Sequence, residues 1–213
     1  MNYMRVAIPS RHGLWELAVL CLLREAPMHP YEMQRLLKER HKDEVLVLKK
    51  GSLYHAIERV LRTRLIAVVD TKREGRRPER TTCRITPEGE QALIRWLKEM
   101  IATPRHEPSE FMACVSFLLY LTPEEAIPQL EQRAQRLEEE VATIGAVMAA
   151  LIDRIKRVNL LESEYLRVMR QAELQWVRGL IADLRSGQLT WDLEKIFAAI
   201  RAAKAQATMP KEA

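Results

Sequence analysis

The sequence predicts a mainly α-helical protein with one small β-hairpin, divided into two domains. Amphipathic helical patterns cover most of the chain, and two short β-prone segments flank a single basic turn. A segment with two prolines, residues 103–109, separates the two halves. We therefore expect an N-terminal domain over residues 1–103 and an all-α C-terminal domain over residues 110–205, the latter built on a long coiled-coil-like helix.

The composition supports folded domains and an uneven distribution of charge. The chain has 213 residues, 47% of them hydrophobic, which argues against intrinsic disorder. Residues 1–100 carry 20 Lys and Arg against 13 Asp and Glu, whereas the remainder carries 14 against 16. We expect only the first half to meet a polyanion, and both nucleic acid and an acidic membrane surface fit that charge.

Two short amphipathic helices are expected at residues 31–40 and 52–62. In the second, Leu53, Ile57 and Val60 fall on one face. A short helix that is apolar on one side and basic on the other has the right shape for a DNA major groove, although a solvated surface helix has the same pattern. The polar side carries Lys49, Lys50, Ser52, His55, Arg59 and Arg62.

A basic hairpin follows these helices. Residues 65–70 and 81–85 are rich in Val, Ile and Thr, and the segment between them contains Gly75 and Pro78. Two helices followed by a basic hairpin are typical of a winged helix-turn-helix, in which the helix reads base edges and the wing lies against phosphates. The hairpin carries Lys72, Arg73, Arg76, Arg77, Arg80 and Arg84.

Four motifs in this half occur in the order found in one known family. They are Pro27-Met28-His29-Pro30-Tyr31-Glu32-Met33, Gly51-Ser52-Leu53-Tyr54, Leu65-Ile66 and Ile85-Thr86-Pro87-Glu88-Gly89. In these motifs the chain resembles the PadR family of bacterial transcriptional regulators. Two positions depart from the family pattern, because Pro30 and Arg64 stand where the family usually has Gly. Proline is acceptable at a first helical position, whereas Arg64 is expected to change the turn into the wing.

With this resemblance we expect a homodimeric transcriptional regulator, more specifically a repressor. Two-fold pairing would present two recognition helices to one face of double-stranded DNA, so we expect the operator to be an inverted repeat. The resemblance also implies a small effector, often phenolic or drug-like, bound in or near the dimer core. An adaptor that uses its coiled coil to bind another protein, with an inert winged domain, is the alternative. Tyr54 is either a DNA contact or partly core. We expect DNA contacts from Tyr31, Lys49, Lys50, Ser52, Tyr54, His55, Arg59, Arg73, Arg76 and Arg77.

The second half predicts long helices. Thr122 and Glu125 form a capping box, after which apolar residues recur at alternating spacings of three and four from Ile127 to Val158. This seam favours a partner helix, and packing inside the same subunit is the alternative. A further helix at 161–184 places Tyr165, Met169, Ala172, Trp176, Leu180 and Leu184 on one face. The residues expected at the dimer interface are Leu130, Leu137, Val141, Ile144, Met148, Leu151 and Ile155.

Several other functions find no support in the sequence. The five histidines and three cysteines lack metal-ligand spacing, and no nucleophile elbow or Gly-rich phosphate loop occurs, so we expect neither a metal, a cofactor nor an enzyme. No apolar run reaches the roughly 18 residues of a membrane span, and the first residues lack the apolar segment of a signal peptide. We expect a soluble, cytoplasmic protein without a membrane partner.

Overall fold

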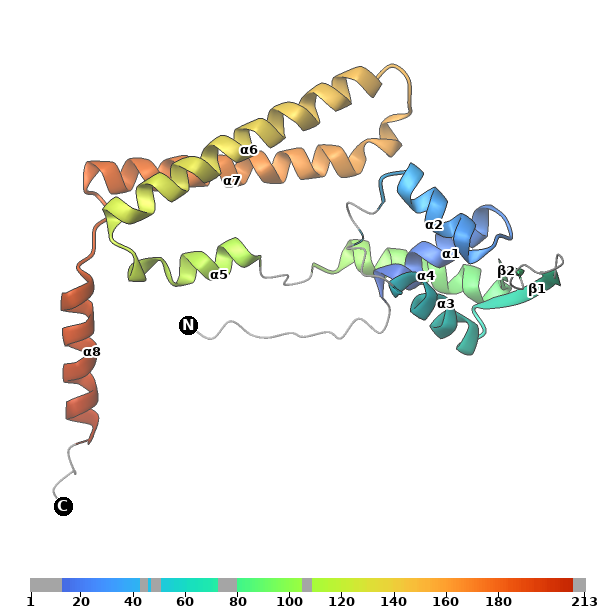
Figure 1. Ribbon diagram of the computed structural model, residues 1–213, viewed down its shortest axis with the longest axis horizontal. Coiled ribbons are helices and arrows are strands. Elements are labelled where there is room, and N and C mark those ends of the chain that lie inside the picture. Colours follow the sequence, from blue (N-terminus) through green and yellow to red (C-terminus); the bar gives the residue numbers. More distant parts are fainter. Residues whose placement is uncertain (1–12, 43–45, 47–50, 73–79, 105–108, 209–213) are drawn as a thin grey trace. The chain divides into compact units, whose positions relative to one another are not determined.

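The computed structural model describes residues 13–42, 46, 51–72, 80–104 and 109–208. The chain forms two compact units, residues 1–106 and 107–213. Helices dominate both units, and the described strands form one two-stranded antiparallel sheet (Figure 1). The mainly helical fold with a small hairpin, predicted from the sequence, is thus confirmed.

The first unit consists of four helices and the hairpin. Helix α1 packs against α3, α4 and β2, so it forms the centre of this unit. Strands β1 and β2 pair antiparallel, with Ile66 opposite Ile85 and a bulge between Val68 and Asp70. The elements are α1 Leu14–Glu25, α2 Pro30–Glu39, α3 Ser52–Arg62, β1 Ile66–Lys72, β2 Arg80–Ile85 and α4 Pro87–Ala102.

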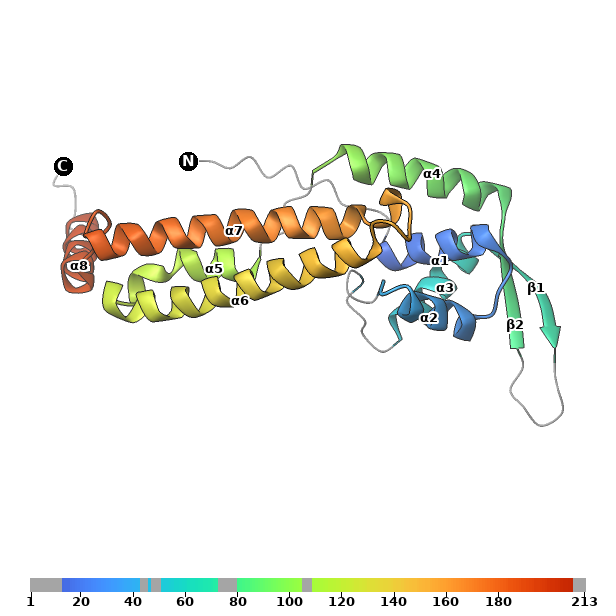
Figure 2. The ribbon, with the colours of Figure 1, turned by 90° about the horizontal axis from the view of Figure 1, so that it is seen from above.

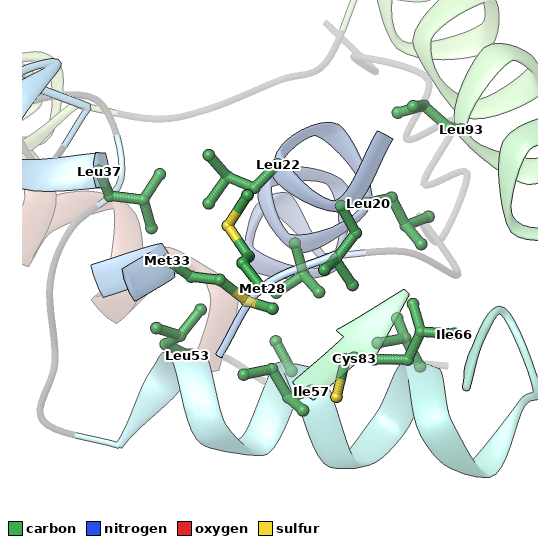
Figure 3. Packing of buried hydrophobic residues seen from close by; sticks show 14 of the residues in the cluster. Leu20, Leu22, Met28, Met33, Leu37, Leu53, Ile57, Ile66, Cys83 and Leu93 are labelled. Carbon is green, nitrogen blue, oxygen red and sulfur yellow. The ribbon is translucent and has the colours of Figure 1, made fainter. Parts of the chain in front are cut away.

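The core of this unit brings together side chains from all of these elements. Figure 3 shows Leu20 and Leu22 of α1 meeting Met33 of α2, Ile57 of α3 and Cys83 of β2. The remaining fully or nearly buried residues include Leu37, Leu53, Val60, Ile66, Ala92, Leu93 and Trp96.

The spacing of apolar residues predicts a buried stripe on α1 through Leu14, Leu17, Ala18, Cys21 and Leu22. Leu22 is buried and Leu17, Ala18 and Cys21 are partly buried against the core, but the prediction is wrong for Leu14. Leu14 is 47% exposed, and the buried hydrophobic residues are Val19, Leu20, Leu22 and Leu23. Almost every side of this helix is apolar, so the sequence pattern does not determine which side faces the core. The contacts of α1 with α3 and with α4 determine which side of α1 is buried.

A third segment extends the hairpin. The Met28 N–H donates to the Cys83 carbonyl at 3.0 Å, and the Cys83 N–H donates to the Met28 carbonyl at 3.1 Å. Met28 and Cys83 are both buried. The segment that leads into α2 is therefore fixed to the base of the wing through backbone bonds, which explains the place of Met28 just before the helix start.

The turn from α3 into the wing keeps a left-handed residue although it lacks glycine. Arg64 has φ of 59°, in the region that favours Gly. The Arg64 carbonyl accepts from the Thr86 hydroxyl at 2.9 Å, and the Leu65 carbonyl accepts from the Thr86 N–H at 3.0 Å. Thr86 also caps α4, with Pro87 at the first helical position as its sequence predicts. The expectation that Arg64 changes this turn is therefore wrong, because the residue adopts the left-handed conformation that glycine would have.

The second unit is built on two long helices. Figures 1 and 2 both show α6 and α7 lying side by side and antiparallel. Phe111 of α5 packs against the core that these two helices form. The capping box of Thr122 and Glu125 at the start of α6 is confirmed. The elements are α5 Glu110–Ser116, η1 Leu118–Tyr120, α6 Pro123–Leu151, η2 Arg157–Asn159, α7 Leu161–Ser186 and α8 Leu193–Thr208.

The apolar seam of α6 is shorter than the sequence predicts. Helix α6 ends at Leu151, so Ile155 lies in the connection to α7, and Val158 lies in η2. The prediction of an uninterrupted seam to Val158 is therefore wrong. A turn and a short 3₁₀ helix reverse the chain here. The apolar residues keep the same spacing through this reversal, so the spacing alone does not show where the helix ends.

The first half of the same seam is the core of this unit. Leu130, Ala134 and Leu137 are buried against Leu174, Val177, Ile181 and Leu184 of α7 in the same chain. The prediction that Leu130 and Leu137 face a partner helix is corrected accordingly, because α7 already covers them. A narrow apolar stripe is satisfied equally well by a neighbouring helix of the same subunit.

Ion pairs accompany this packing along α6 and α7. Arg133 donates to Glu173 at 2.7 Å and lies 3.6 Å from the centre of the Phe111 ring of α5. Arg170 pairs with Glu140 and Arg178 with Glu138, each at 2.8 Å, and Arg185 pairs with Glu131. These ion pairs are spread along the two helices and fix how residues of α6 align with residues of α7.

Candidate nucleic-acid interface

Helix α3 has one buried side and one exposed polar side. Gly51 precedes it with φ of 91°, a left-handed conformation that lets the chain turn directly into the helix. Leu53, Ala56, Ile57 and Val60 are buried in the core. The expected extent of the helix, residues 52–62, agrees with the structure.

The opposite side of α3 carries four of the ten predicted DNA contacts, namely Ser52, Tyr54, His55 and Arg59. Tyr54 is 49% exposed, so it is available at the surface, and the side chain of Ser52 is half-buried. His55 is exposed, and its Nδ1 lies 3.5 Å from the Glu58 carboxylate one turn further along. Ser52, His55, Arg59 and Arg62 recur at spacings of three, four and three residues, which places them along one side of the helix.

Arg59 is tied to α1. Its Nε donates to Glu16 Oε1, and this bond raises the pKa of the Arg59 guanidinium above its ordinary value. The Arg59 side chain remains 45% exposed, whereas the Glu16 side chain is 11% exposed. The arginine therefore has one end against the protein and the other at the surface of α3.

Sequence reasoning missed Glu16. It is the one buried charged residue among those the structure describes. The available signal was a single acidic residue within the otherwise apolar stretch Leu14–Leu23, whose burial requires a basic partner.

The first residues of α2 lie at the surface, and His29 caps the helix. The His29 imidazole accepts a hydrogen bond from the Tyr31 N–H at 3.1 Å, and Pro30 occupies the first position of the helix as expected. Tyr31 is 68% exposed. Its hydroxyl and the helix N-terminus are both suited to contact a phosphate oxygen.

Five of the predicted DNA contacts lie outside the described residues. These are Lys49, Lys50, Arg73, Arg76 and Arg77. Among described residues, Arg62, Arg64 and Arg84 are exposed near the end of α3 and the base of the wing. The described surface around α3 is thus rich in hydrogen-bond donors and positive charge, as contact with nucleic acid requires.

The residues predicted for dimerisation divide into two groups. Leu130 and Leu137 form the internal core, whereas Val141, Ile144, Met148, Leu151 and Ile155 are half-buried. The face of α7 that sequence spacing identifies is largely uncovered. Tyr165 is 69%, Met169 50% and Trp176 48% exposed. We call Tyr165, Met169, Ala172 and Trp176 the α7 stripe.

Two shallow grooves of about 450 and 390 Å³ lie along α6 and α7, and their charged lining residues Glu131, Glu138, Arg178 and Arg185 are already paired. Within the described part of the chain, no group of His, Cys, Asp and Glu is arranged to hold a metal. No described helix combines the length and apolar character needed to cross a membrane.

The first unit has the architecture of a winged helix-turn-helix domain, since α2 and α3 are followed by a hairpin and a closing helix. Comparison with known proteins agrees. Residues 19–95 match the model of the transcriptional regulator PadR-like family. No characterised protein sequence matches the chain closely enough to be called a relative.

Solved structures extend the similarity over both units. Bacillus subtilis PadR in complex with operator DNA has a TM-score of 0.63 at 18% identity, over 81% of this chain and 99% of that one. The same protein with p-coumaric acid gives 0.64 at 17% identity, with the same coverage. A PadR-like regulator from Bacillus cereus gives 0.54 at 15% identity, again over 81% and 99%.

The chain therefore carries a PadR-like domain over residues 19–95 and has the fold of the PadR-family transcriptional regulators. The resemblance read from its motifs is confirmed. Regulators of this family are not enzymes, in agreement with the sequence prediction.

Proposed function

We propose that this protein is a sequence-specific, DNA-binding transcriptional repressor that acts in the cytoplasm. One observation carries the proposal. Helix α3 buries Leu53, Ile57 and Val60 while leaving Tyr54 and His55 at the surface, next to a hairpin with a basic turn. A helix held in this way by its apolar side presents its polar side to the major groove.

The roles of the individual residues follow from their positions. Ser52, Tyr54 and His55 lie in the first turns of α3 and contact base edges, while Tyr31 at the start of α2 contacts a phosphate. Lys49 and Lys50 precede α3 in sequence, and Arg73, Arg76 and Arg77 lie between β1 and β2 in sequence. These five residues supply charge for the phosphate backbone.

The protein acts as a homodimer in this proposal. A single winged helix contacts one half-site, which gives little specificity in a genome, and two-fold pairing presents two α3 helices to an inverted repeat. The α7 stripe, together with the half-buried residues Ile144 and Met148 of α6, offers an apolar surface for that pairing. The half-site centres are then about 10 or 20 base pairs apart.

A small aromatic effector completes the proposal. Its support is the solved structure of Bacillus subtilis PadR with p-coumaric acid. The two grooves on α6 and α7 do not argue for its location, because their charged groups are already paired. Adding phenolic acids to the DNA-binding assay tests this part separately: release of DNA at micromolar to millimolar concentrations supports it, and unchanged binding opposes it.

The decisive experiment is selection of bound sequences from a random DNA pool, followed by titration of the selected site. We expect an inverted repeat, and a steep decrease of affinity with salt. The variant with Ser52, Tyr54 and His55 all changed to Ala should lose preference for that site, and His55→Ala alone should weaken binding by about 1–3 kcal/mol. The Arg76/Arg77 double alanine variant should instead lower affinity for all DNA and reduce the salt slope by roughly one to two units.

Two results would contradict the proposal. Unchanged sequence preference in the triple alanine variant would remove α3 from the interface. Salt-independent or absent DNA binding by the wild type would favour a protein-binding adaptor instead.

A further inference from the structure

The carboxylate of Glu16 is buried in the first turn of α1, with 8% of the residue exposed. A buried carboxylate is costly unless a basic group pairs with it. Its partner is Arg59, which comes from the exposed side of α3, 43 residues further along the chain. The pair therefore links the central helix of the first unit to the side of α3 that faces outward.

The bond to Glu16 uses only one nitrogen of the Arg59 guanidinium and leaves the others available to bind a ligand. Nε of Arg59 donates to Glu16 Oε1, and no other hydrogen-bond partner is found for this side chain within the described part of the chain. The side chain is 45% exposed, so its outer end is in solvent. Because the bond to Glu16 uses Nε, Nη1 and Nη2 are available as two parallel donors, the arrangement with which arginine binds the O6 and N7 atoms of guanine.

Arg59 lies one helical turn beyond His55 on the same side of α3. A free arginine at this position would be a mobile charge that binds any phosphate. Pairing with Glu16 makes the net charge of the two residues close to zero and fixes the guanidinium plane. The pair therefore loses most of its value as a phosphate contact and gains directional hydrogen bonding, which is what base recognition needs.

We propose that Glu16 is a positioning residue that holds Arg59 in place to read a guanine within each half-site. This inference rests on the proposed DNA-binding function and deepens it, since it assigns a base to one residue and a second residue to its orientation.

The test compares sequence preferences of the full-length wild type with those of Glu16→Met, Glu16→Gln and Arg59→Lys. Met fills nearly the same volume as Glu but cannot accept the Nε bond, whereas Gln keeps an acceptor oxygen. Lys keeps the charge of Arg59 without its two parallel donors. We expect Glu16→Met and Arg59→Lys to lose preference for G·C at the same single position, by about 5- to 100-fold. Glu16→Gln should retain part of that preference.

Two further readouts separate positioning from a general effect on folding. The double variant Glu16→Met with Arg59→Lys should be no less selective than Arg59→Lys alone, because Glu16 acts through Arg59. The salt slope should change by less than about one unit in Arg59→Lys, because the charge is kept. Glu25→Gln is the matched control, since it breaks another ion pair of α1, with Arg40 of the segment after α2, and should leave every base preference unchanged.

The contrary outcomes are distinct. Independent, additive losses from Glu16→Met and Arg59→Lys would overturn the proposal, as would a loss confined to Arg59→Lys. If Glu16→Met does not fold, Glu16→Gln decides: wild-type preference at the position that Arg59→Lys affects would overturn it, and a partial loss there supports it. A wild type that selects no sequence would end the proposed function itself, whereas a selective wild type with insensitive variants would end only this inference.

Discussion

The carbonyl oxygen of Leu65 lies 2.0 Å from the position that a Cβ atom on Gly89 would occupy. Gly89 is in the first turn of α4, where its N–H donates to the Thr86 hydroxyl at 3.1 Å, and Leu65 immediately precedes β1. The absence of a side chain at residue 89 thus lets α4 start directly against the end of the turn that follows α3. This contact fixes the wing relative to the closing helix and gives a physical reason for the glycine of the Ile85–Gly89 motif.

Gly89→Ala should destabilise the first unit by about 1–3 kcal/mol, because the added methyl group meets backbone atoms that cannot move alone. Thermal or urea unfolding measures the loss. Gly179→Ala is the matched control, since no atom lies within 4 Å of its added Cβ in α7. It should stabilise the protein by roughly 0.5–1 kcal/mol. Equal changes in unfolding free energy for Gly89→Ala and Gly179→Ala would contradict the close approach of residue 89 to the Leu65 carbonyl.

Arg64→Gly should stabilise the protein by about 1 kcal/mol, because Arg64 adopts φ of 59° without a glycine's freedom. The gain is checked by the midpoint of urea unfolding. Arg62→Gly, two residues earlier in the last turn of α3, removes the same charge and should instead cost roughly 0.5–1 kcal/mol. A loss of stability in Arg64→Gly would mean that the arginine side chain contributes more than the backbone conformation costs.

The ion pair between Glu25 and Arg40 predicts a weak dependence of stability on pH. Hydrogen bonds from Arg40, at 2.5 and 2.7 Å, lower the pKa of the Glu25 carboxyl below its ordinary value of 4.5. A carboxyl with a lowered pKa in the folded state contributes stability above its unfolded pKa and loses it as the pH falls through the folded one. Both side chains are a little under half exposed, so solvent screens the pair and the contribution should not exceed about 1 kcal/mol.

Comparison with Glu25→Gln measures this effect. The wild type should be the more stable protein at neutral pH, and the difference should shrink as the pH falls below 4.5 and vanish below the lowered pKa of the folded state. A difference that persists unchanged into strong acid would show that the pair does not act through the charge of Glu25.

The α7 stripe should be required for dimerisation but not for folding. Changing Tyr165 and Met169 together to Lys places two charges on an exposed apolar surface and should convert a dimer into a folded monomer in sedimentation experiments. DNA affinity should decrease because two half-sites are no longer bound together. A double variant that remains dimeric would place the interface elsewhere.

Two single changes serve as controls for the stripe. Leu137→Lys buries a charge in the internal core and should unfold the second unit, because Leu137 is 3% exposed. Gln171→Lys adds a charge to an exposed position away from the stripe and should leave both folding and dimerisation unchanged.

The sequence by itself determined which elements form in the first unit. The limits of α3 follow from Gly51, the apolar spacing of residues 53–60 and the end of that spacing before the wing, all of which are local signals. The caps Thr86 and Thr122 are equally local, because a side chain and a backbone N–H three residues apart are enough to define them. The resemblance to PadR regulators rests on the same short motifs.

Only the tertiary structure decided what each apolar face packs against. The seam of α6 has the same spacing whether its partner is α7 or a second subunit, and the structure places Leu130 and Leu137 against α7. The pairing of Glu16 with Arg59 joins residues 43 apart in the chain, so no periodicity within either helix predicts it. Periodicity reports that a face must be buried, whereas the identity of its partner depends on contacts between distant segments, which form only when the chain folds.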